Sequence, residues 1–199
     1  MPPTDTITPE RAARLEEVLR RRQPDLTVVF ENVHDPHNVS AVLRSCDAVG
    51  VFEAHGVYHS GEQFPKLGDK SSGSARKWID LHKHDSIDDC YSELRARGMK
   101  IYTTHMASGS VSLYDLDLTQ PIAFVFGNEH SGVSQEALAR ADGNFLIPQM
   151  GIVQSLNISV ACAVSLYEAF RQRMNAGMYE ALRLDEKIFP VLLDDWCHR

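Results

Sequence analysis

The chain has 199 residues, of which 43% are hydrophobic and 24% are charged, a composition typical of one globular domain. No apolar run approaches the roughly 18 residues that cross a bilayer, and residues 1–9 lack the basic start and apolar stretch of a signal peptide. These features exclude a membrane span and predict a cytoplasmic location. The net charge of −7 argues, by itself, against a phosphate-rich partner.

The first part of the chain predicts an amphipathic helix followed by a strand, a helix and a second strand. Thr8 and Pro9 have the residue types of a helix cap and first position, and the helix is expected to continue to Arg22. Residues 26–30 and 52–59 are β-branched or apolar runs typical of strands, and residues 39–46 have helical spacing. The Gly-, Ser- and Lys-rich residues 61–77 predict a long loop of the kind that is often functional.

The second part continues the alternation. Strands are expected at 78–83, 100–105, 121–126 and 144–147, with helices at 86–97 and 135–141. A last helix is predicted to bury one face made of Leu156, Val160, Val164, Tyr167 and Phe170. This order predicts an α/β fold with a mostly parallel sheet and helices on both faces.

Polar and glycine-rich segments follow several of these strands. They are residues 31–38, which lead into a helix that carries Arg44, residues 103–105, residues 127–132, and residues 148–157. Because ligands of parallel sheets bind beyond the carboxyl ends of the strands, these segments are expected to form a pocket. No G-x-G-x-x-G sequence is present, which argues against a dinucleotide-dependent oxidoreductase.

The charge is unevenly distributed. Residues 8–22, 64–78 and 171–183 carry net charges of +2, +3 and +2, so the rest of the chain is strongly acidic. This distribution fits either a basic face on an acidic body or ordinary solvated helix faces.

The cysteines and histidines do not form a recognisable metal motif. Cys46, Cys90, Cys162 and Cys197 are far apart in the sequence, which predicts reduced and mostly buried thiols rather than disulfides or a thiolate site. Alternation places His82 and His84 on one face of a strand, but two ligands are too few for a metal site. We therefore expect that no metal is required.

Three segments in fixed order resemble the motifs of the SpoU/TrmH branch of the SPOUT methyltransferases. They are NVSAVLR at 38–44, FVFGNEHSG at 124–132 and IPQMGIVQSLN at 147–157. The resemblance extends from about residue 10 to about residue 180. The phrases RRQPDLTV and RQRMNAGMY are similar to the TrmH subgroup, whose members methylate the ribose of the D-loop guanosine at tRNA position 18.

The resemblance implies a fold that periodicity does not predict. It implies a homodimer of SPOUT domains, here residues 26–175, with a C-terminal trefoil knot in about 120–175. Residues 1–25 are expected to form an N-terminal helical extension that binds tRNA, and residues 176–199 a C-terminal helical tail. Knots are rare exceptions to the usual rules of chain connection.

The resemblance also implies the site residues. The methyl donor is S-adenosylmethionine, with S-adenosylhomocysteine as the product, and the matching cofactor positions are Thr104, Gly127, Asn128, Ile147, Met150 and Leu156. Arg44 matches the catalytic arginine of the family, and Asn38, Glu129, Ser155 and Asn157 match its other important polar positions. A guanidinium is a poor proton acceptor, so Arg44 is expected to fix geometry and stabilise negative charge while an RNA phosphate takes the proton.

The same resemblance favours the basic-face interpretation. The cations expected to contact tRNA phosphates are Arg11, Arg14, Arg22, Lys70, Arg76, Lys77, Arg171 and Arg173. Two enzymatic alternatives remain open, namely 2′-O-methylation of ribosomal RNA and of the tRNA wobble position. A third alternative is a catalytically silent knotted protein that binds RNA.

Overall fold

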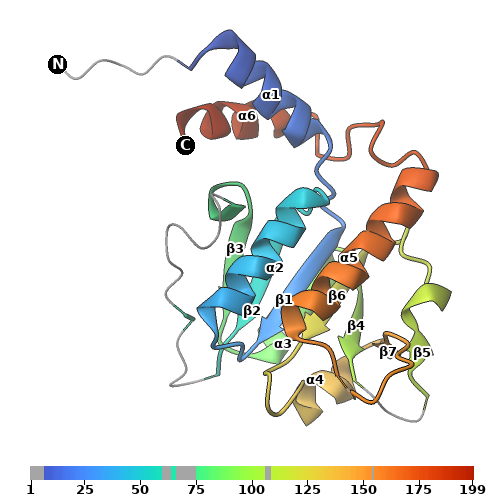
Figure 1. Ribbon diagram of the computed structural model, residues 1–199. Coiled ribbons are helices and arrows are strands. Elements are labelled where there is room, and N and C mark those ends of the chain that lie inside the picture. The colour runs from blue at the N-terminus through green and yellow to red at the C-terminus, as the bar shows by residue number, and fades with distance from the viewer. Residues whose placement is uncertain (1–6, 60–63, 66–74, 106–108, 154) are drawn as a thin grey trace.

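A computed structural model describes residues 7–59, 64–65, 75–105, 109–153 and 155–199. Its centre is a sheet of seven strands, all parallel, in the order β3-β2-β1-β6-β4-β7-β5 (Figure 1). The strands are β1 Leu26–Glu31, β2 Glu53–Val57, β3 Asp80–His84, β4 Lys100–Thr104, β5 Val111–Ser112, β6 Ile122–Phe126 and β7 Gly143–Leu146. The expected mostly parallel α/β sheet is therefore confirmed, and it is parallel throughout.

Helices cover both faces of the sheet. The helices are α1 Pro9–Arg20, α2 Pro36–Ala48, α3 Ile87–Ala96, α4 Gln135–Arg140, α5 Ile158–Asn175 and α6 Phe189–His198, with short 3₁₀ turns η1 Ala75–Lys77 and η2 Leu113–Asp115. Helices α2 and α5 bury their apolar sides against one face, and α3 and α4 bury theirs against the other. The sheet is thus enclosed by two apolar layers, as buried parallel strands require.

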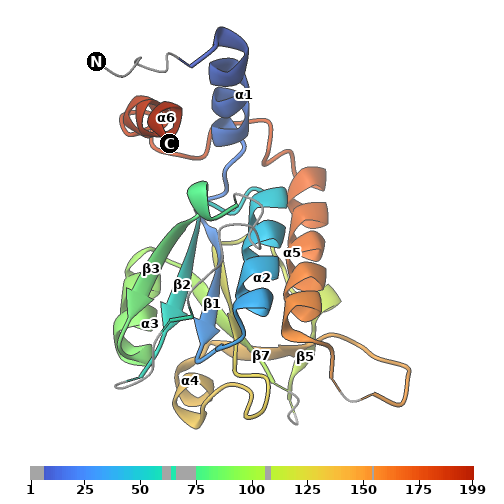
Figure 2. The ribbon, with the colours of Figure 1, turned by 60° about the vertical axis from the view of Figure 1, so that its left-hand side comes forward.

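Helices α1 and α6 pack on each other rather than on the two sheet faces. Leu15 and Leu19 of α1 meet Phe189 and Trp196 of α6 in a separate apolar cluster. Figures 1 and 2 show this pair of helices at the amino end of the strands, opposite α4. The expected terminal helices are present, and they form one unit beyond the end of the sheet.

The predicted helices and strands lie close to the observed ones, with two exceptions, and most of the predicted loop at 61–77 lies outside the described residues. Strand β5 and the turn η2 were not predicted, because two residues are too short for a periodic pattern. The predicted apolar face of the last helix is right only in part: Val164 and Phe170 pack against the core, whereas Val160 is 47% exposed and Tyr167 is 52% exposed. The fully buried apolar residues of α5 are Ile158, Cys162, Leu166 and Ala169.

The cysteines are free, as predicted, and three of the four are buried. Among the described residues, no helix is long and apolar enough to cross a bilayer.

Candidate active site

The carboxyl ends of β4, β6 and β7 surround a cavity of about 540 Å³. Its wall combines glycines and polar side chains from residues 127–132 with side chains from residues 145–158. The half-buried Leu146, Ile147 and Leu156 give it apolar surface, whereas Glu129 and Asn157 give it polar groups. A pocket with apolar walls and a few convergent polar groups is the usual form of a site for a small organic ligand.

The turn after β6 requires glycine. A Cβ atom on Gly127 would lie 2.1 Å from the backbone carbon of Gly132, and Gly132 itself has φ +68°. Asn128 closes this turn, since its amide donates to the Asn32 carbonyl at 2.8 Å and its side-chain oxygen accepts from the His130 N–H at 2.9 Å. The turn therefore folds back on itself and presents its backbone to the cavity.

Three predicted polar residues from separate parts of the chain form one hydrogen-bonded chain. The Asn38 amide donates to Glu129 Oε1 at 2.9 Å, and the Asn157 amide donates to Asn38 Oδ1 at 3.1 Å. Asn38 is buried within α2, whereas the helix cap is Asp35, whose carboxylate accepts from the His37 N–H. Asn157 also caps α5 by accepting from the Ser159 N–H at 2.8 Å. The start of α2, the turn after β6 and the start of α5 are thus fixed relative to one another.

Most of the predicted cofactor residues lie together. Thr104, Gly127, Asn128, Ile147 and Leu156 all line the cavity. So does Ser155, which was predicted as a catalytic residue.

Met150 does not line the cavity, because it belongs to an outer part of the 148–153 loop and is 97% exposed. Residues that the sequence reasoning did not single out also line it, among them Phe126, His130 and Gln149. All three belong to the two motif segments, so motif membership was the available clue. Gln149 Oε1 is buried and accepts no hydrogen bond from the described residues.

Arg44 lies on the exposed side of α2 and does not line the cavity of its own chain. No ion pair joins its guanidinium to a carboxylate within the described ranges of the chain. The guanidinium is therefore available to a ligand or to another chain.

The predicted RNA-contacting cations fall into three groups. Arg11 and Arg14 on α1, and Arg76 and Lys77 on η1, are exposed. Arg171 is exposed too, although it pairs with Glu168 at 2.7 Å, which raises the pKa of Arg171. Lys70 lies outside the described residues.

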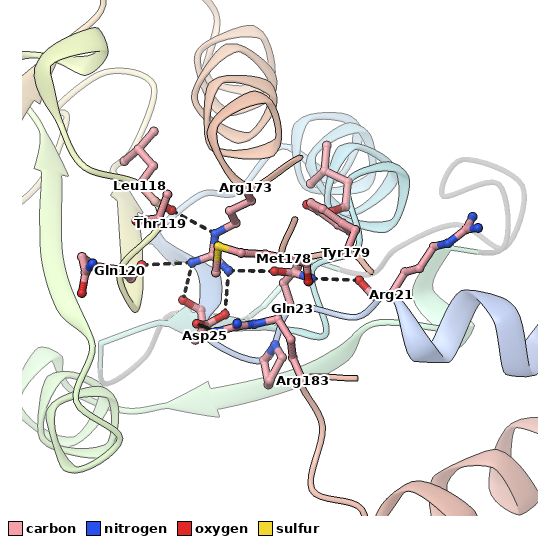
Figure 3. A network of polar contacts seen from close by, with 12 residues as sticks. Arg21, Gln23, Asp25, Leu118, Thr119, Gln120, Arg173, Met178, Tyr179 and Arg183 are labelled. Atoms are coloured by element: carbon pink, nitrogen blue, oxygen red, sulfur yellow. Dashed lines mark hydrogen bonds and ion pairs between the residues drawn. The ribbon is translucent and has the colours of Figure 1, made fainter. Parts of the chain in front are cut away.

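Arg22 and Arg173 are completely buried, so the expectation that they contact RNA is wrong. Arg22 pairs with Asp47 at 2.6 Å and lies over the Trp196 ring, which joins the α1–α6 pair to the sheet domain. Figure 3 shows Arg173 at the centre of a polar network with Asp25 and neighbouring backbone carbonyls. Both side chains satisfy internal acceptors and are closed to solvent.

Comparisons with known proteins agree with this geometry. Residues 25–167 match the model of the SpoU rRNA Methylase family. The chain is 50% identical to the tRNA (guanosine(18)-2′-O)-methyltransferase of Thermus thermophilus, over 96% of this chain and 98% of that protein.

Two solved structures are similar as well. The TrmH/SpoU tRNA modifying enzyme of A. aeolicus superposes with a TM-score of 0.88 at 39% identity, covering 95% of each chain. The SpoU methyltransferase AviRb of Streptomyces viridochromogenes, in complex with the cofactor AdoMet, gives a TM-score of 0.70 at 28% identity, covering 77% of this chain and 62% of that one. The chain therefore belongs to the SpoU methylase family.

Proposed function

We propose that this protein transfers a methyl group from S-adenosylmethionine to the ribose 2′-hydroxyl of guanosine 18 in the D-loop of tRNA. The observation that carries the proposal is the 50% identity to the Thermus enzyme along nearly the whole of both chains. That match covers 96% of this chain, so it extends beyond the sheet domain of residues 26–175. The family alone covers methylases of other RNAs, so the full-length match decides the substrate.

The cavity fits S-adenosylmethionine. The half-buried Leu146, Ile147 and Leu156 offer apolar contact for a nucleoside base, and Gln149 Oε1 is a buried acceptor that needs a donor. The turn at Gly127 and Gly132 lets the backbone approach a ligand closely. The cofactor supplies an electrophilic methyl on a sulfonium, and these residues bind and orient it.

Methyl transfer requires the ribose oxygen in line with the methyl carbon. The oxygen forms the new bond to that carbon while the carbon–sulfur bond breaks, and the hydroxyl proton leaves to an RNA phosphate or to water. The role we assign to the chain of Asn38, Glu129 and Asn157 is to hold the mouth of the cavity in place. The guanidinium of Arg44 binds the RNA phosphate and stabilises negative charge on the reacting oxygen.

We infer a homodimer joined through the outer side of α5. Val160, Tyr167 and Met174 recur at seven-residue spacing there and are 47%, 52% and 49% exposed. The exposed side chains of Met150, Ile152 and Val153 add apolar surface near the start of α5. An apolar stripe of this kind on a water-exposed helix is typical of a covered interface.

In the inferred dimer, Arg44 of one chain acts at the cavity of the partner chain, because Arg44 does not line the cavity of its own chain. A mixed dimer tests this: one chain carries Arg44→Ala with an intact cavity, and the other carries Gly127→Ala with an intact Arg44. If Arg44 serves the partner's cavity, two inactive homodimers give an active mixed dimer. Inactive mixed dimers of proven composition place Arg44 with its own chain.

We further infer that the C-terminal part of the chain, about residues 120–175, has the trefoil knot of its relatives. The support is the placement of β6 between β1 and β4 and of β7 between β4 and β5, with residues 155–158 returning to the cavity beside 127–132. We assign tRNA binding to the α1 surface with Arg11 and Arg14, and to Arg76 and Lys77. Replacing Arg11 or Arg14 by Ala should flatten the salt dependence of tRNA binding, whereas an unchanged slope would remove that residue from the interface.

Nucleoside mass spectrometry tests the function. An unmodified tRNA transcript is incubated with the protein and S-adenosylmethionine, beside a transcript in which only guanosine 18 is replaced. We expect 2′-O-methylguanosine in the first transcript and none in the second. Methylation of both would refute the site, and methylation of neither, with proven cofactor binding, would favour ribosomal RNA or a silent RNA-binding protein.

A further inference from the structure

Three side chains with metal-binding atoms meet on the α3 face of the sheet, away from the cavity. They are His55 of β2, His84 of β3 and Cys90 of α3, and one ligand atom of each lies within 4.8 Å of the others. The nearest pair is His55 Nδ1 and His84 Nε2, at 3.0 Å. None of the three lines the cavity, so the cluster is separate from the proposed methyltransfer site.

The fold explains why these residues meet. The parallel register pairs His84 with Val57, and Val57 packs against α3 in the same apolar cluster as Cys90. His55 lies two residues before Val57 and therefore points to the same face of the sheet. The site thus takes one ligand from each of three elements.

The donor set and spacing fit zinc. Two imidazole nitrogens and one thiolate are zinc ligands, with bonds of about 2.0–2.1 Å to nitrogen and 2.3 Å to sulfur. A tetrahedral site with those bonds separates its ligand atoms by about 3.3–3.7 Å. His55 Nδ1 and His84 Nε2, at 3.0 Å, must move apart by about 0.3 Å, and no two ligand atoms are more than 4.8 Å apart, so side-chain shifts of about 1 Å form the site.

The surroundings fit a cation as well. Glu53 Oε1 lies 3.5 Å from His55 Nε2, the ring nitrogen that faces away from His84. Histidines that bind metals usually give their second N–H to a carboxylate, and Glu53 is the carboxylate beside this ring, although His55 Nε2 makes no hydrogen bond at this distance and Glu53 Oε1 accepts from Arg97. His55 and Cys90 are completely buried, whereas His84 is half-buried on the edge strand and leaves a path to solvent.

We propose that His55, His84 and Cys90 bind one zinc ion, with water as the fourth ligand. The Cys90 thiol releases its proton to solvent when the zinc–sulfur bond forms, and each histidine binds as a neutral imidazole. The bound ion links the edge strand β3 to β2 and α3. Zinc here stabilises the fold and takes no part in methyl transfer.

The alternative is a metal-free hydrogen-bonded chain. In that arrangement His55 donates from Nε2 toward Glu53 and accepts at Nδ1 from His84. Direct metal binding distinguishes the two, because a hydrogen-bonded chain needs no ion.

The experiment uses the full chain, stripped with EDTA and titrated with zinc against a chromogenic chelator. We expect one zinc per chain and a rise in melting temperature. His84→Ala should fold, because His84 is half-exposed. It should weaken zinc binding at least about tenfold, because even residues that only hydrogen-bond to a metal ligand contribute that much to metal affinity. Cobalt(II) should give a thiolate charge-transfer band that Cys90→Ser removes.

His82→Ala is the matched control, since His82 neighbours the cluster on the same strand but is not among the three ligands. It should keep zinc affinity within a few-fold. No zinc binding to the stripped protein, or binding that His84→Ala and Cys90→Ser leave unchanged, would overturn the proposal and leave the hydrogen-bonded chain.

Discussion

Replacing Arg173 by Met should destabilise the protein by about 3–5 kcal/mol, the usual cost of removing one partner from a buried ion pair. All five N–H groups of this guanidinium are used, on the carbonyls of Leu118, Asp25 and Gln120, on Gln23 Oε1 and on Asp25 Oδ1. The network joins the end of α5 to the segments that precede β1 and β6 (Figure 3). Met fills much of the volume but leaves each of these acceptors without its donor.

For a chain of this length, that loss corresponds to a decrease in melting temperature of roughly 6–20 °C. Urea denaturation and thermal unfolding measure this loss of stability. The protein concentration is the same for all variants, because self-association changes the apparent stability. Arg171→Met is the matched control, two residues away on the exposed side of α5, and it should leave stability nearly unchanged. A loss below about 1 kcal/mol for Arg173→Met would refute the reasoning, as would wild-type stability in Arg173→Lys, which cannot reproduce the fork of five donors.

The site and its supports give three further predictions. Gly127→Ala should reduce binding of S-adenosylhomocysteine at least tenfold by calorimetry, because its Cβ would lie 2.1 Å from backbone, and near-normal affinity would contradict this. Asn38→Asp should lower kcat and weaken cofactor binding, since a carboxylate facing Glu129 replaces a donated hydrogen bond with repulsion at the mouth of the cavity; unchanged values of both would remove Asn38 from the site. Burial raises the pKa of Asp25, but Arg173 and Arg183 outweigh it and lower that pKa, so the folded state loses stability as the pH falls. Asp25→Asn should therefore lose less stability than the wild type between about pH 5 and pH 3 in urea denaturation.

The sheet was predictable because its strands are short apolar runs separated by helical spacing. The pocket was predictable too, since parallel strands bring the segments after β4, β6 and β7 to one edge. The hydrogen bonds among Asn38, Glu129 and Asn157 were not predictable, because they depend on how two helix starts and one turn meet in space.

The buried face of α5 shows where the sequence reasoning failed. This helix is apolar on two sides, and the predicted set is divided between them: Val164 and Phe170 pack against the core, whereas Val160 and Tyr167 are exposed. Cys162, Leu166 and Ala169 have equally good helical spacing, and continuing their series by four residues reaches Arg173. Two residues along a helix turn the side chain by about 200°, so Arg171 and Arg173 had to lie on different faces. One of the pair therefore had to be a poor choice for contacting RNA.

The proposed tRNA-binding surface on α1 and the cavity lie at opposite ends of the sheet, which restricts the size of an RNA that can contact both. The α1–α6 unit lies at the amino end of the sheet (Figure 2), while the residues that line the cavity lie at the carboxyl ends of the strands. A strand of five residues is about 17 Å long, so the cations of α1 and the reacting ribose are separated by at least that distance within one chain. A small substrate cannot contact both places. An RNA that touches Arg11 or Arg14 while its ribose occupies a cavity must extend along the sheet domain or across to a second copy, which favours a folded tRNA over a short oligonucleotide.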